Sequence, residues 1–194
     1  METEKIKKLI RTKESYACEN IKLPQELKEN AKKLCFEYNS KWNTDEQSKK
    51  ILDELFGTTS EFMVVAAPFH CDYGFNIHVK GLAVINYNCT IVDTSPVYLG
   101  KNIFVGPNVC ISCVGHAIDP VQRAQSVTIS KSIHIEDDVW IGANSVICGG
   151  VHIGAGSVVT KDIPAGVVAV GNPCRVIRQI NEQDKISKDM MLPL

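Results

Sequence analysis

The sequence predicts a mainly β protein in which a parallel coil of six-residue repeats follows a small α-helical region. Aliphatic residues recur every six positions through most of the stretch from Val79 to Val159, whereas the first 57 residues follow a helical spacing instead. The six-residue period stops after Ile111 and resumes at Ile135. Long departures from a regular scaffold often carry function, so this break predicts a functional loop projecting from the coil.

The N-terminal region reads as short helices with charged outer faces. Apolar residues there recur at i, i+3 and i+4, the spacing that places side chains on one helix face. Pro24 marks the start of the second helix, and Gly57 ends the third. The apolar positions are Ile6, Leu9 and Ile10, then Leu27, Ala31, Leu34, Cys35 and Tyr38, then Ile51, Leu52, Leu55 and Phe56. We therefore expect a helical domain over residues 1–57.

The six-residue period has a simple structural meaning. A strand of about four residues and a two-residue corner bring the same inward position back on each face of a coil, and such repeats stack into a solenoid. Glycines that follow the aliphatic, such as Gly100 and Gly106, are expected to relax the backbone where it bends. The repeating aliphatics are Val79, Ile85, Ile91, Leu99, Val105, Ile111, Ile135, Ile141, Ile147, Ile153 and Val159. We expect the coil over 58–180, with its loop at 116–134, and a tail over 181–194.

Composition narrows the class of protein. The formal net charge of −1 favours neither nucleic acid nor an anionic membrane as a partner. Apolar stretches are too short for a membrane helix, and the charged N-terminus lacks the apolar stretch of a signal peptide, so we expect a cytoplasmic protein. The eight cysteines are scattered, and we interpret them as free thiols that behave as small hydrophobes.

Several motifs together resemble the maltose/galactoside O-acetyltransferases of the hexapeptide-repeat acyltransferase superfamily. They are KKLCFEYN (32–39), ILDELFG (51–57), PFHCDYGFNI (68–77), NYNCTIVD (86–93), GHAIDP (115–120), DDVWIG (137–142), GAGSVVTKDIP (154–164) and GNPCRVIR (171–178). The resemblance implies a left-handed parallel β-helix and a homotrimer with active sites between subunits. It also implies acetyl-CoA as donor, a sugar-like hydroxyl as acceptor and no required metal.

Histidine suits the base that this reaction needs, because its pKa lies near neutral pH. His116 opens the predicted loop and matches the catalytic histidine of the family. A loop histidine with a purely structural role is the alternative. Cys113 lies three residues before it, but it occupies a strand position, and the family needs no covalent intermediate.

The resemblance also implies an acceptor site made of short polar side chains. Asp72, Asn86 and Asp93 match positions near the acceptor, where directional hydrogen bonds would hold sugar hydroxyls. Tyr16 and Lys28 match acceptor-side positions of the helical domain. The alternative for Asn86, and for its neighbour Asn88, is a corner residue that tolerates positive φ.

The coenzyme site is expected along the later repeats. Trp140 would wall the pantetheine arm, unless it is an outward structural tryptophan, and backbone N–H groups at Gly142 and Ala143 would stabilise the developing oxyanion. The remaining positions that the resemblance implies for coenzyme binding are Ala155, Thr160, Lys161, Arg175 and Arg178. Arginine and lysine there would suit phosphates.

The chain departs from the family pattern in three places. The stretch VICGGVHIGAGSVV (146–159) is one hexapeptide short, which should rotate the following chain by a third of a turn unless a local irregularity compensates. Beside His116 the usual proline is Ala117, and the usual late-loop glutamate is Thr128. Near the N-terminus, YACEN (16–20) replaces acidic contacts, and Lys28 replaces an arginine, losing a bidentate contact.

Three other functions remain open from the sequence. The first is a hexapeptide acetyltransferase with an amine or non-sugar acceptor. The second is a non-catalytic β-helix that serves as a binding module, which the missing hexapeptide favours and the retained His116 disfavours. The third, a metalloenzyme like the γ-carbonic anhydrases, would need several histidines converging between subunits, and only His116 lies in the loop region, since His134 is assigned to the coil.

Overall fold

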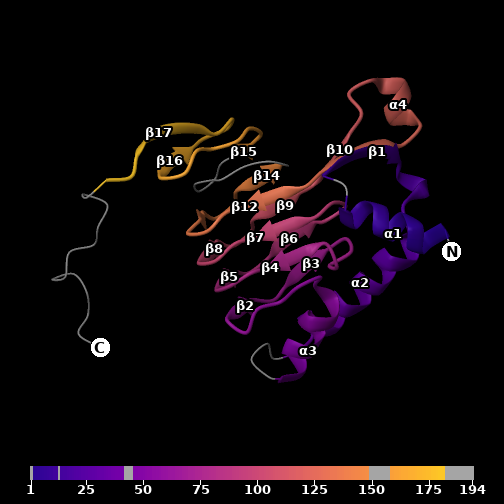
Figure 1. Ribbon diagram of the computed structural model, residues 1–194, viewed down its shortest axis with the longest axis horizontal. Helices are drawn as coiled ribbons and strands as arrows, with labels where there is room; N and C mark the ends of the chain where they lie inside the picture. Colours follow the sequence, from indigo (N-terminus) through magenta and orange to yellow (C-terminus); the bar gives the residue numbers. More distant parts are fainter. Residues whose placement is uncertain (1, 13, 42–45, 149–157, 182–194) are drawn as a thin grey trace.

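The protein is described here by a computed structural model covering residues 2–12, 14–41, 46–148 and 158–181. Stacked strands form a central coil, and the N-terminal helices lie along one side of it (Figure 1). A hairpin that carries α4 projects from the coil. Among the helices in these ranges, none is both long and apolar enough to span a bilayer.

The three predicted N-terminal helices are confirmed. They are α1 (Glu2–Thr12), α2 (Gln25–Asn39) and α3 (Glu46–Leu55). Ile10, Leu34 and Leu55 are buried, as the helical spacing requires, whereas Leu9 stays 42% exposed.

Polar groups tie α2 to the first turn of the coil. The Asn39 side chain donates to Phe69 O and accepts from Phe69 N, both at 2.9 Å. The Tyr38 hydroxyl donates to Val65 O. Satisfying these buried polar groups fixes where the helical region sits on the coil.

The coil is a left-handed β-helix with three parallel sheets. The five-stranded sheet is ordered β15-β14-β9-β6-β3, the four-stranded sheet β13-β8-β5-β2, and the three-stranded coil sheet β12-β7-β4. The strands are β2 (Met63–Val65), β3 (Phe69–Cys71), β4 (Ile77–Val79), β5 (Ala83–Ile85), β6 (Cys89–Val92), β7 (Val97–Leu99), β8 (Ile103–Val105), β9 (Cys110–Ser112), β12 (Ile133–Ile135), β13 (Trp140–Ile141), β14 (Val146–Cys148) and β15 (Val158–Val159).

The six-residue aliphatics form the inner ladders of this coil. In the five-stranded sheet Ile91, Ile111 and Ile147 lie in register, and each is at most 1% exposed. The other two sheets stack their aliphatics in the same way. Burying such a side chain stabilises the fold by about 1.5–3 kcal/mol, so the ladders supply most of the core. Ile153 lies outside the described residues.

The corners correct one expectation about glycine. Gly100 and Gly106 lack positive φ; they are small because the next turn passes close by. A Cβ on Gly106 would lie 2.6 Å from Ala143 N. Positive φ falls instead on corner residues with short polar side chains, which tolerate this conformation. These are Asn88, Asn102, Asn108, Asp138 and Asn144.

The predicted loop 116–134 is a folded hairpin rather than an irregular excursion. The chain leaves the coil through β10 (Val114–His116), passes through α4 (Pro120–Ala124) and returns along β11 (Val127–Lys131). Strand β1 (Ser15–Glu19), which the sequence analysis did not predict, pairs antiparallel with β11 and completes the sheet β1-β11-β10. A short 3-10 helix, η1 (Asn20–Lys22), leads from β1 towards α2.

The missing hexapeptide does not rotate the strand that follows it. Strand β15 pairs in parallel with β14, with Ile147 opposite Val159, and so continues the five-stranded sheet. The rotation expected from the shortened repeat is therefore not found at β15; the residues between the two strands, 149–157, lie outside the described ranges.

The C-terminal part of the described chain is an antiparallel hairpin of β16 (Val167–Val170) and β17 (Arg175–Gln179). The expected tail over 181–194 lies outside the described residues except for Asn181. All eight cysteines are free thiols, as predicted.

Candidate active site

The candidate site is built on two edges of the coil. At the histidine edge, the chain passes from the five-stranded sheet to the β12-β7-β4 sheet, and Asp72, Asp93 and the hairpin lie there. At the asparagine edge, it passes from the four-stranded to the five-stranded sheet, at Asn86 and at Gly142–Ala143. A strand of three or four residues, roughly 10–13 Å, separates the two edges within one chain.

Asp93 organises the histidine edge from inside. Its Oδ1 accepts from Asp72 N at 3.0 Å and from Tyr73 N at 2.8 Å, while Oδ2 accepts from Asn76 N at 3.3 Å. Burial raises the pKa of Asp93 to about 8, and the neighbouring Asp72 charge adds to this, while the backbone donors oppose it. The side chain is 0% exposed, so the acceptor contact predicted for Asp93 does not fit; it holds the Asp72 corner in place instead.

Lys28 and Asp72 form an ion pair beside this corner. Lys28 Nζ lies 2.7 Å from Asp72 Oδ2, and the two side chains are 16% and 30% exposed. The same ammonium lies 5.3 Å from the centre of the Tyr73 ring. The structure therefore brings together two of the predicted acceptor residues, but each neutralises the charge of the other.

Tyr16 joins β1 to the coil. Its hydroxyl donates to Thr94 O at 2.6 Å, and burial raises its pKa to about 12. Below it, the buried Ser130 hydroxyl lies 2.6 Å from Thr94 Oγ1 and 2.7 Å from Ser95 Oγ. The sequence analysis missed this hydroxyl cluster. Its signal is the polar pair Thr94–Ser95 directly after Asp93, ahead of the next core strand.

His116 ends β10 with an exposed side chain. Its register partner across the sheet is Thr128, whose own partner on the far side is Cys18. The Thr128 hydroxyl donates to Cys18 O at 3.2 Å. Within the described residues, no side chain hydrogen-bonds the His116 ring, so the ring is open to a substrate hydroxyl.

The asparagine edge carries the other predicted contacts. Asn86 is half-buried and its Oδ1 accepts from Tyr87 N at 2.8 Å, while Asn88 has φ 60°, the corner conformation considered for both. Since Ile85 and Ile141 lie two strands apart in one sheet, Asn86 and Gly142 sit on the same edge, roughly 10 Å apart. Trp140 points outward from the four-stranded sheet and is 70% exposed.

The remaining coenzyme residues are spread along the coil. Thr160 and Lys161 follow β15 and are exposed, so they lie at the histidine edge two strands beyond β9. Arg175 and Arg178 are exposed on β17. Ala155 lies outside the described residues. A single chain therefore does not gather this set into one pocket.

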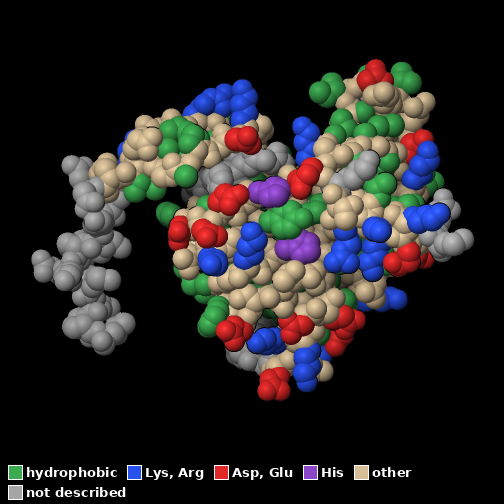
Figure 2. All heavy atoms as spheres, viewed as in Figure 1, with side chains coloured by type: hydrophobic (Ala, Val, Ile, Leu, Met, Phe, Trp, Pro, Cys, Tyr) green, Lys and Arg blue, Asp and Glu red, His purple; other side chains and the backbone are tan. Residues whose placement is uncertain are grey.

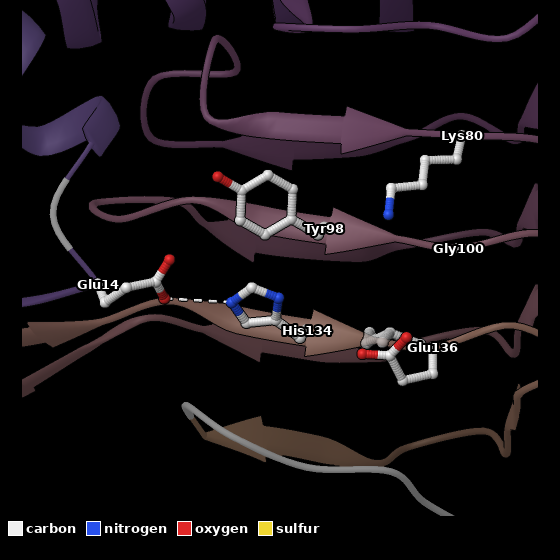
Figure 3. A pocket seen from close by; sticks show the side chains of 7 residues that line it. Glu14, Lys80, Tyr98, Gly100, His134 and Glu136 are labelled. Carbon is white, nitrogen blue, oxygen red and sulfur yellow. Dashed lines mark hydrogen bonds and ion pairs between the residues drawn. The ribbon is translucent and has the colours of Figure 1, made fainter.

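A separate cavity of about 230 Å³ lies on the outer face of the β12-β7-β4 sheet (Figure 3). There the Tyr98 ring lies between His78 and His134, with centroids 5.1 Å and 4.8 Å apart, and Glu14 pairs with His134 at 3.1 Å. The cavity holds none of the predicted site residues. Charges of both signs are interspersed on the visible face of the molecule, without a continuous patch of either (Figure 2). Across the described ranges, no cluster of three or more His, Cys, Asp or Glu is arranged to hold a metal ion.

A parallel β-helix of six-residue repeats is the hallmark of the hexapeptide-repeat transferases, and the comparisons with known proteins agree. The family model for the bacterial transferase hexapeptide (six repeats) matches residues 132–160. The galactoside O-acetyltransferase of Escherichia coli K12 is 42% identical over 161 residues, covering 79% of each chain.

Solved structures extend the similarity to three dimensions. A galactoside acetyltransferase in complex with coenzyme A superposes with a TM-score of 0.78 and 39% identity, covering 84% of this chain and 85% of that one. A maltose O-acetyltransferase from Clostridium difficile 630 gives a TM-score of 0.74 and 39% identity, covering 81% and 88%. The chain belongs to the maltose/galactoside O-acetyltransferase family of hexapeptide-repeat proteins.

Proposed function

We propose that this protein transfers an acetyl group directly from acetyl-CoA to a hydroxyl of a sugar, with His116 as general base, in a homotrimer whose sites lie between subunits. Family membership makes it an acetyl-CoA-dependent acetyltransferase. Galactoside and maltose acetyltransferases among its relatives and structural neighbours support a sugar acceptor. Because acetyl-CoA is an intracellular metabolite, we place the reaction in the cytoplasm.

The observation that carries the proposal is the exposed ring of His116 at the end of β10, on the sheet β1-β11-β10. In the reaction His116 takes the proton of the acceptor hydroxyl, and the oxygen attacks the thioester carbon. As the carbon–sulfur bond breaks, the thiolate of coenzyme A receives the proton from the imidazolium. Backbone N–H groups at Gly142 and Ala143 are the proposed donors to the carbonyl oxygen as it gains negative charge.

The positions of the proposed site residues support a trimer. His116 and Asn86 occupy different edges of the coil, so a single chain cannot present both to one small acceptor. A neighbouring coil would bring its asparagine edge against the histidine edge of the first. The exposed Trp140 and the split coenzyme residues fit the same arrangement, because the groove between two coils would collect them.

The reaction class is tested by free-CoA release from acetyl-CoA across a panel of sugars and amines. Sugar-dependent release supports the proposal. CoA release that depends only on amines would show that the acceptor is an amine. Coenzyme binding without CoA release in the presence of any acceptor would point to a binding module.

The shared site has its own test. His116→Ala and Asn86→Ala chains, each weakly active alone, are co-expressed and purified as mixed trimers. If the two residues act from different subunits, about a quarter of the sites in random trimers regain both groups and activity returns. Mixed trimers that stay as inactive as the single variants would place the whole site in one chain.

A further inference from the structure

The β10–α4–β11 hairpin, which carries His116, joins the coil at two feet. At the first foot, Cys113 N donates to Val92 O at 3.0 Å, and at the second, Ile133 N donates to Pro96 O at 2.9 Å. The chain therefore leaves the coil and returns to it on either side of one short segment of the previous turn. What this segment contacts decides where the base of the hairpin lies.

The rest of the hairpin has a more open setting. Its tip with α4 extends beyond the coil (Figure 1), and Ile118 there is 93% exposed. Strand β10 lies at the edge of the sheet β1-β11-β10. A Cβ built on Gly115, the residue before His116, would meet no described atom within 4 Å apart from its chain neighbours. The position of His116 therefore depends on how firmly the base of the hairpin is held.

Three buried hydroxyls fill that base. Ser130 is the register partner of Val114, which lies two residues before His116. The Ser130 hydroxyl lies 2.6 Å from Thr94 Oγ1 and 2.7 Å from Ser95 Oγ, and all three residues are at most 1% exposed. A buried hydroxyl that loses its partner is unfavourable, so this network resists a shift of the hairpin against the coil.

The same short segment also holds the acceptor corner. Asp93, the first residue of the 93–95 segment, accepts through Oδ1 from Asp72 N at 3.0 Å and from Tyr73 N at 2.8 Å. The next two side chains contact the hairpin. Three consecutive side chains thus bind the corner that carries Asp72 on one side and the strand that leads to His116 on the other.

We propose that Thr94, Ser95 and Ser130 are positioning residues for the acetyl transfer, whose hydroxyls fix His116 relative to the corner at Asp72. The inference rests on the proposed function of His116 as general base. Because the three side chains are buried, they act through the place of the hairpin and not by contact with a substrate. A displacement of about 1 Å can lower the rate roughly 100-fold, so this cluster should influence kcat.

The test removes hydroxyls with as little change of shape as the chain allows. Thr94→Val and Ser130→Ala lose a hydroxyl, whereas Thr94→Ser keeps it. The first two should lower kcat by about 10-fold or more and leave the affinity for acetyl-CoA within about twofold, while Thr94→Ser should stay within about threefold of the wild-type kcat. The kcat is measured per folded protein well below the melting temperature, so a loss of stability alone does not change it.

A second readout does not depend on activity. Hydrogen–deuterium exchange of residues 113–131, followed by mass spectrometry, should be about 10-fold faster or more in Thr94→Val and Ser130→Ala than in the wild type or Thr94→Ser. Ser48→Ala is the matched control, because Ser48 is a buried residue (1% exposed) on α3, far from the hairpin (Figure 1). It should leave both kcat and the exchange of the hairpin unchanged.

Two outcomes overturn the inference. One is a kcat within about twofold of wild type in both Thr94→Val and Ser130→Ala, and the other is a loss in Thr94→Ser as large as in Thr94→Val. If Thr94→Val does not fold, Ser95→Ala takes its place beside Ser130→Ala. A wild-type protein that acetylates no acceptor would reject the proposed function. The exchange of residues 113–131 would then still decide whether the hydroxyls hold the hairpin, and unchanged exchange would overturn the inference by itself.

Discussion

In the coil, neighbouring strands in a sheet come from successive turns, as with Ile85 and Val105, and the contacts repeat from turn to turn. The sheet β1-β11-β10 is held differently, because Ser15 pairs with Lys131 from the far side of the sequence. The coil buries aliphatic ladders, whereas the sheet and the histidine edge bury hydroxyls and a carboxyl group and hold a partly exposed ion pair. Stability is thus concentrated in the regular part, and polar, reactive groups in the irregular part.

The largest expected effect is a loss of catalytic rate, without a loss of stability, on removal of His116. His116→Ala should lower the kcat of acetyl transfer by about 10²–10⁴-fold, since the acceptor loses its base. The melting temperature and acetyl-CoA affinity should stay unchanged, because the ring is exposed. His70→Ala, at another exposed histidine of the coil, is the control and should keep full activity. A His116→Ala variant with near-normal kcat would contradict the assigned base.

A substitution in a ladder of the coil should instead lower the stability of the fold. Ile111→Ala removes a side chain that is 1% exposed in the middle of a ladder and should lower the free energy of unfolding by about 2–5 kcal/mol. Urea denaturation at one fixed protein concentration measures this, since oligomers unfold in a concentration-dependent way. Phe36→Ala, at an exposed position, should cost little. A loss below about 1 kcal/mol for Ile111→Ala would show that the ladders do not dominate stability.

Asp93 links the two regions and should make stability depend on pH. Its folded pKa, raised to about 8 by burial, exceeds that of an unfolded aspartate, so the folded state binds the proton more tightly. Stability from this group is present in acid and falls as pH rises from about 4 to 8, by up to about 5 kcal/mol. Asp93→Asn should flatten that slope, as measured by denaturation at pH 5 and pH 8. An equal dependence of stability on pH in both proteins would mean that groups other than Asp93 cause it.

The smallest effect is expected from the Lys28–Asp72 pair. Because both side chains retain some contact with solvent, a double-mutant cycle with Lys28→Met and Asp72→Asn should give a coupling of about 1 kcal/mol or less. The cycle is read from urea denaturation and, separately, from the KM for the acceptor. A coupling in stability without one in KM would make the pair structural. A coupling above about 3 kcal/mol would mean that the pair is shielded as fully as the core.

The helices and the coil were predictable because their signals are local. The i, i+3, i+4 pattern around Leu34 and the six-residue recurrence through Ile91 and Ile111 each reflect a periodic backbone whose inner face must be apolar. The role of the glycines was misjudged at Gly106, where the reason for a missing side chain is the backbone of the next turn, not its own φ. Sequence spacing contains no information on such an approach between turns.

The candidate site was predictable only in part. His116 stood out because it interrupts a repeat. The burial of Asp93 and the strand that contains Tyr16 had no such signal in the sequence. A carboxyl group that binds substrate and one that accepts backbone N–H groups look alike in sequence. Strand β1 is five residues long and adjoins a helix, so its pairing with β11 left no periodic signal.

The sequence by itself determined the coil, its three N-terminal helices and the histidine that the chemistry requires, because each depends on neighbours in the chain or on a side chain's intrinsic pKa. Only the tertiary structure decided that Asp93 supports the corner and that β15 continues its sheet despite the shortened repeat. It also decided that His116 and Asn86 lie on separate edges. These are long-range arrangements, set by packing between segments that the order of residues does not place side by side.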